Sequence, residues 1–80
     1  MVVLIAKSLD EIKDYIDYAK CVIYRVYPDE IRIRVGRYGI RYKPKDDKDR
    51  DRILRWLEEL KQVKVVIQVV NTIADEAFFS

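Results

Sequence analysis

Apolar and polar residues alternate most regularly between residues 31 and 43, where the sequence reads IRIRVGRYGIRYK. This pattern predicts a β-hairpin with a turn within residues 36–39 and with Val35 opposite Ile40. Because successive side chains of a strand point to opposite faces of a sheet, one face of the hairpin should be apolar and the other cationic. The apolar face comprises Ile31, Ile33, Val35, Ile40 and Tyr42, and the cationic face comprises Arg32, Arg34, Arg41 and Lys43.

Two other segments have the spacing of amphipathic helices. The sequence Ser8-Leu9-Asp10-Glu11 is a capping box, and it should open a helix that ends near Lys20. Asp46 or Asp47 can cap a second helix that runs to about Gln62. The side chains predicted to be buried along the two helices are Leu9, Ile12, Ile16, Ile53, Leu57 and Leu60.

Three further apolar runs predict strands at residues 2–6, 21–27 and 63–70, the first of them buried on both faces. The predicted order is therefore β-α-β-β-β-α-β, an α/β (α+β) fold with a single mixed sheet and two helices on one face. The helices should pack on the apolar hairpin face and on Val65 and Ile67. On the open face we expect the hairpin arginines, with Arg25, Tyr27, Lys64 and Gln68 beside them.

The length and composition of the chain limit the classes of protein to which it can belong. The chain of 80 residues predicts one small domain, 1–80, in which 71–80 is a candidate docking tail. It has one cysteine and no histidine, so we expect no disulfide, no metal and no cofactor. No apolar run is long enough for a membrane span, which favours a cytoplasmic protein.

The amino-acid composition also indicates the kind of organism from which the chain comes. Charged residues make up 38% of the chain, whereas Asn, Gln, Ser, Thr, Met and Cys together number eight. Proteins of hyperthermophiles favour charged surfaces and avoid thermolabile amides. We therefore expect the source to be a thermophilic archaeon or its virus.

Positive charge is concentrated in the middle of the chain. Residues 21–45 carry seven basic side chains against two acidic ones, a net charge of +5, although the whole chain has only +2. Such a basic face predicts a nucleic-acid-binding protein without enzymatic activity, with DNA or RNA and single or double strands left open. Arg32, Arg34, Arg41 and Lys43 would contact phosphates, and Arg25 would belong to the same binding site. The hairpin tip would present Arg37 and Tyr38, and Tyr27 would stack on a base.

The main alternative is a protein-protein interaction or assembly module, most simply a homodimer, with no role in nucleic-acid binding. The last strand has few charges and would invite pairing with a second copy at a sheet edge, and Phe78 and Phe79 would suit a groove on a partner. The basic face would also fit an acidic protein.

An enzyme is not expected, because the aspartates between residues 46 and 51 alternate with basic residues and are typical of a helix start. Cys21 and Trp56 are predicted to serve packing.

Overall fold

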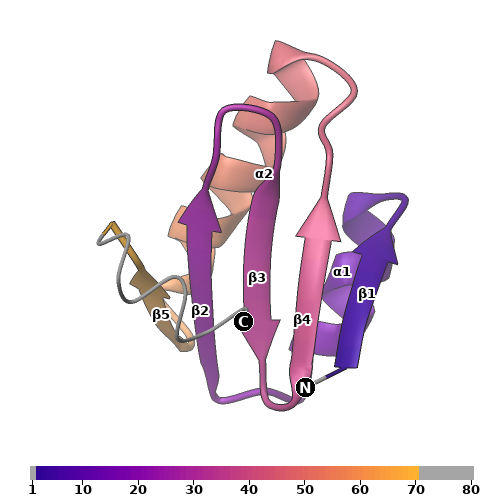
Figure 1. The fold of residues 1–80 in the computed structure, drawn as a ribbon. Coiled ribbons are helices and arrows are strands. Elements are labelled where there is room, and N and C mark those ends of the chain that lie inside the picture. Colours follow the sequence, from indigo (N-terminus) through magenta and orange to yellow (C-terminus); the bar gives the residue numbers. More distant parts are fainter. Residues whose placement is uncertain (1, 71–80) are drawn as a thin grey trace.

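The computed structural model describes residues 2–70, and its elements follow the predicted order (Figure 1). The strands are β1 (Val2–Ala6), β2 (Cys21–Val26), β3 (Ile31–Val35), β4 (Tyr38–Tyr42) and β5 (Val65–Gln68). The helices are α1 (Leu9–Ile16) and α2 (Asp47–Leu60). A single mixed five-stranded sheet with two helices confirms the predicted α+β fold class. The predicted docking tail, residues 71–80, lies outside the described residues.

The strands lie in the order β1-β4-β3-β2-β5. The three central strands pair antiparallel through short turns, whereas β1 pairs parallel with β4 and β5 pairs parallel with β2. Parallel neighbours require long crossover connections, and the helices supply them. Both helices cover the same face of the sheet and leave the other face open (Figure 1). No helix in residues 2–70 is long and apolar enough to span a membrane.

The core lies between the helices and the covered face of the sheet. Every predicted core residue on the two helices and on β3 and β4 is buried, which confirms that part of the prediction. Val65 and Ile67 were predicted wrongly, because they are 58% and 47% exposed on the open side of β5. The prediction that residues 2–6 are buried on both faces is also wrong, since Ile5 is 75% exposed. Both errors have one cause: β1 and β5 are edge strands, and the helices cover only the central strands fully.

The hairpin has a tighter turn than predicted. Val35 pairs with Tyr38 rather than with Ile40, and the turn consists of Gly36 and Arg37. Gly36 has a φ of +57°, a conformation that glycine adopts without the steric cost paid by other residues. A shift of two residues preserves the alternation of faces, so every apolar side chain of the hairpin still points to the core.

The first helix is shorter than predicted. It ends at Ile16 rather than near Lys20, because the N–H of Ala19 bonds to the carbonyl of Ile16 three residues back, at 2.9 Å, instead of continuing the i,i−4 pattern. Lys64 Nζ donates to the carbonyl oxygens of Ile16, Asp17 and Ala19 at 2.8, 2.7 and 2.8 Å. Gln68 accepts a hydrogen bond of 3.3 Å from the hydroxyl of Tyr24, a buried core residue. The expectation that Lys64 and Gln68 lie on the open face is therefore wrong.

A polar contact fixes the start of α2. Asp46 is the N-cap, and its side chain accepts a hydrogen bond of 2.8 Å from the backbone N–H of Asp49. The hydroxyl of Tyr42 donates to Asp49 Oδ2. Burial, followed by this hydrogen bond, raises the pKa of Tyr42 to about 12, and the same hydrogen bond is the main cause that lowers the pKa of Asp49.

The raised pKa of Tyr42 predicts a loss of stability in alkali. A phenol whose pKa is higher in the folded chain stabilises the fold fully below pH 10 and loses that contribution as the pH rises toward about 12. Between pH 9 and 11, wild-type protein should lose about 1 kcal/mol more unfolding free energy than Tyr42→Phe. Urea unfolding at both pH values measures the difference. Tyr18→Phe, at a position that is 97% exposed, is the control and should follow wild type.

Candidate nucleic-acid interface

Three arginines lie side by side across the centre of the open face. Arg25 on β2 pairs in register with Arg32 on β3, and Arg32 pairs with Arg41 on β4. We call these three residues the arginine row. Arg34 lies on the same face, two residues farther along β3. Neighbouring strands are about 4.8 Å apart, so these guanidinium groups repel one another unless anions compensate them. The sequence prediction that these four arginines share one face is confirmed.

A buried carboxylate compensates part of this charge. Glu30 accepts hydrogen bonds from Arg32 Nε at 2.8 Å and from Arg41 Nε and Nη2, both at 3.1 Å. Its side chain is only 5% exposed. Burial on its own would raise the pKa of Glu30, but the hydrogen bonds from Arg41 and Arg32 outweigh it, and the pKa is lowered. Sequence reasoning missed Glu30, although its position two residues before Arg32 places it on the same face.

Tyr27 packs among the arginines. The guanidinium carbon of Arg32 lies 4.5 Å from the centre of the Tyr27 ring, and that of Arg25 lies 5.3 Å away. Contacts at these distances are cation–π interactions, which hold the guanidinium groups in place. Tyr27 therefore lies on the open face, as predicted, but its ring already contacts two cations. Its predicted role as a stacking platform for a base stays a prediction.

The remaining predicted site residues lie at or near the hairpin ends. Arg37 is exposed in the turn, and Lys43 is exposed directly after β4. Tyr38 is not at the tip, because the two-residue turn makes it the first residue of β4 and points it toward the helices. Its ring packs against Tyr15 of α1, with the ring centres 5.2 Å apart. The structure thus brings the arginines and Tyr27 together and separates Tyr38 from them.

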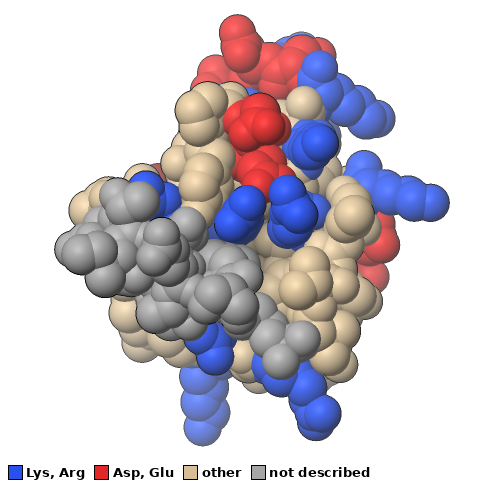
Figure 2. Space-filling model, viewed as in Figure 1, with Lys and Arg blue, Asp and Glu red and all other residues tan. Residues whose placement is uncertain are grey.

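Apolar side chains are exposed on the two edge strands of the open face. Figure 2 views this face and shows basic and acidic side chains together near its middle, with further basic side chains at its right and lower margins. Val3 and Ile5 of β1 and Val65 and Ile67 of β5 are exposed there. Cys21 is exposed as well, so its predicted place in the core is wrong. It opens β2 opposite Val65 and precedes buried Val22, so the alternation of the strand places it on the open face.

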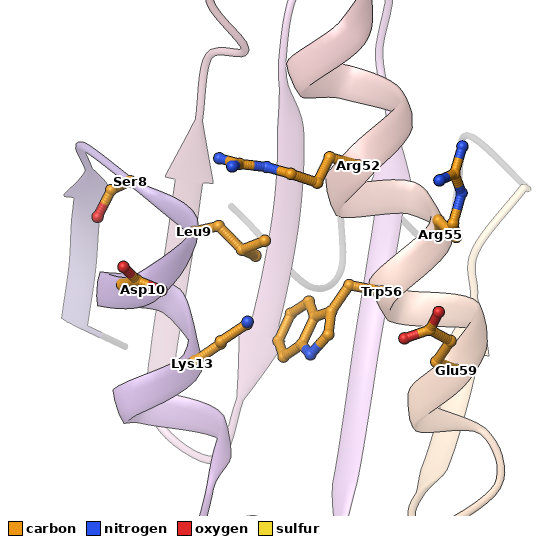
Figure 3. Close-up of a pocket in the computed structure, with 8 residues that line it drawn as sticks. All are labelled: Ser8, Leu9, Asp10, Lys13, Arg52, Arg55, Trp56 and Glu59. Atoms are coloured by element: carbon orange, nitrogen blue, oxygen red, sulfur yellow. The ribbon is translucent and has the colours of Figure 1, made fainter.

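The helix side carries a groove of mixed charge between α1 and α2 (Figure 3). Lys13 points toward Trp56, and its ammonium lies 5.7 Å from the indole ring. Trp56 is half-buried against the core, as its predicted packing role requires. Both signs of charge line the groove, in Asp10, Lys13, Arg52, Arg55 and Glu59. Within residues 2–70, no group of three or more His, Cys, Asp or Glu side chains is placed to hold a metal ion.

Comparison with known protein families, with curated proteins and with solved structures gave no match to this chain.

Proposed function

We propose that the open face of the sheet binds nucleic acid through the phosphate backbone, without catalysing a reaction. The arginine row is the observation that carries this proposal. Guanidinium groups pair with phosphate oxygens through two parallel hydrogen bonds, and they lose less hydration than ammonium groups when they do so. Three such groups on adjacent central strands form a line of positive charge that a polyanion can follow.

The surroundings of these arginines support the proposal, because they restrict side-chain motion. Glu30 holds Arg32 and Arg41, and the Tyr27 ring contacts Arg25 and Arg32. A side chain that is already ordered loses less conformational entropy on binding, so more of the interaction energy appears as affinity. Arg41 nevertheless keeps 43% of its side chain exposed and can reach a ligand.

The same contacts favour phosphates over bases as the groups that are bound. Sequence-specific readout needs polar groups that reach base edges or aromatic rings that stack on bases. Tyr27 is engaged by two guanidinium groups, and Tyr38 packs against Tyr15 under the sheet. We therefore propose binding with little sequence preference, in which Arg37 adds one charge at the hairpin tip.

The double substitution Arg25→Gln and Arg41→Gln tests this proposal. Fluorescence anisotropy with labelled single-stranded DNA, duplex DNA and duplex RNA at about 50–200 mM salt measures affinity and its salt dependence. For duplex DNA and three phosphate contacts, the logarithm of the association constant should fall with the logarithm of salt at a slope of about −3. The double variant should bind at least about tenfold more weakly at low salt and lose about two units of that slope.

A matched control removes two basic side chains from the helix side. Lys48 and Arg55 are exposed on α2, so Lys48→Gln with Arg55→Gln makes the same change in net charge without touching the open face. Equal losses in the two double variants would contradict a site on the open face. If no nucleic acid binds even at low salt and the chain sediments as a dimer, the assembly function replaces this proposal. In that case the exposed edge strands β1 and β5 supply the interface.

A further inference from the structure

Hydrogen-bonding groups at the β2 end of the arginine row are unsatisfied within residues 2–70. Arg25 Nε and Nη1 and the hydroxyl of Tyr27 are buried, and within residues 2–70 none of these atoms has a hydrogen-bond partner. Buried polar atoms are paired in the great majority of cases, because an unpaired one costs about 1–3 kcal/mol. The carboxylate of Glu30 is already bonded to Arg32 and Arg41. Glu30 therefore supplies no acceptor to Arg25, and an acceptor from outside residues 2–70 would satisfy it.

The course of the chain after β5 leads to this position. Gln68 pairs with Tyr24, and the N–H of Val69 donates to the carbonyl of Tyr24 at 2.8 Å. Because β5 runs parallel to β2, the two strands advance together, and residues 69 and 70 are level with residues 25 and 26. The segment that follows Val70 thus begins about one strand spacing from Arg25 and Tyr27.

The sequence of that segment complements the open face in charge and in polarity. Residues 71–80 read NTIADEAFFS, with two acidic side chains, Asp75 and Glu76, and no basic one. They also include the apolar residues Ile73, Phe78 and Phe79, and exposed Ile67 lies on the open face. Ten extended residues reach at most about 33 Å, whereas the arginine row spans two strand spacings, about 10 Å. The segment is long enough to cross the whole row.

We infer that residues 71–80 dock on the open face of their own chain, where Asp75 and Glu76 meet the arginine row. The carboxylates supply acceptors for Arg25, and the phenylalanines cover apolar surface near β5. Docking at this place makes the segment a competitor of nucleic acid. The competition rests on the proposed function, whereas the docking itself does not.

Paramagnetic relaxation in the full chain tests the docking without any nucleic acid. The variant carries Cys21→Ser and Ser80→Cys, so that a nitroxide label is attached at residue 80 alone. Docking should broaden the guanidinium Nε–Hε signals of Arg25 and Arg41 and leave the indole N–H signal of Trp56 on the helix side much sharper. Broadening that is equal on both sides, or strongest at Trp56, would overturn the inference.

The acidic side chains are tested by Asp75→Asn with Glu76→Gln. In the labelled chain this change should remove most of the broadening at Arg25. In the unlabelled chain it should tighten duplex binding about tenfold, because the open face is then no longer occupied. Asp10→Asn with Asp14→Asn changes the net charge equally on exposed positions of α1 and should tighten binding far less. An equal gain in the two double variants contradicts competition. If no variant binds nucleic acid, the proposed function fails, and the relaxation data still decide on docking.

Discussion

Replacing Glu30 with glutamine is expected to destabilise the fold and, at the same time, to tighten nucleic-acid binding. The substitution leaves the size of the side chain unchanged but removes the negative charge that Arg32 and Arg41 share. Breaking a fully buried ion pair costs about 3–5 kcal/mol. Because both arginines keep access to water, we expect a loss of about 2 kcal/mol in the free energy of unfolding.

The destabilisation should depend on pH in a defined direction. The pKa of Glu30 is lowered in the folded chain, so its stabilising effect is complete above the ordinary value of 4.5 and is lost as the pH falls through the lowered pKa. Wild type and Glu30→Gln should therefore differ most near pH 7 and converge in acid. Urea unfolding at about pH 7 and pH 3 measures both differences. If wild type and Glu30→Gln differed equally in unfolding free energy at both pH values, the charge of Glu30 would not be the cause of the difference.

The same substitution, Glu30→Gln, should raise the affinity for nucleic acid although it lowers the stability of the fold. Without Glu30 the net charge of the open face rises by one, and duplex DNA should bind about threefold more tightly at low salt. Glu59→Gln, at an exposed position on α2, changes the net charge equally and serves as the control. If Glu30→Gln binds no more tightly than this control, the arginine row is not the binding site.

Replacing Lys64 with methionine is expected to lower the free energy of unfolding by about 2 kcal/mol. Methionine keeps most of the apolar stem but cannot donate to the three carbonyl groups at the end of α1. Those carbonyls carry the negative end of the helix dipole, which a cation stabilises. Lys64 also directly precedes β5, so its contacts tie the last strand to the first helix.

Lys61→Met is the matched control for this substitution. Lys61 pairs with Glu58 on the surface of α2 at 2.8 Å, and both side chains are largely exposed. Such a pair contributes less than about 1 kcal/mol. Urea unfolding should separate the two variants clearly, and amide hydrogen exchange should quicken at the end of α1 in Lys64→Met alone. Similar stability losses would mean that the cap contributes little.

The central part of the fold could be predicted from local patterns. Alternation over residues 31–43 defined the faces of β3 and β4, and helical spacing with capping side chains defined the two helices. These patterns suffice because a helix or strand that is buried on one face repeats its apolar residues with the period of that element. They do not reveal which strand lies at an edge, since edge position depends on the order of strands in space. Val65, Ile67 and Ile5 were therefore assigned to the core although they are exposed.

The candidate site was predicted only in part, for a related reason. The side of the sheet on which each arginine lies follows from alternation, but the contacts of its guanidinium group depend on residues in neighbouring elements. Glu30 and Lys64 form multiple hydrogen bonds that no spacing rule identifies. Tyr38 was misplaced because the hairpin turn is two residues tighter than the one predicted, which moved its ring from the tip to the helix side.

The arrangement of β1 also affects how the chain folds during synthesis. Strands β2, β3 and β4 meet through short turns and can pair as soon as they are made, whereas Val2 has to find Tyr38 far along the chain. The ribosome produces β1 before β4, so the uncharged apolar segment VVLIA stays unpaired until β4 has emerged. Such a segment is prone to aggregate while it is exposed. The yield of soluble protein should therefore depend on how quickly the central hairpins form, more than on the final stability of β1.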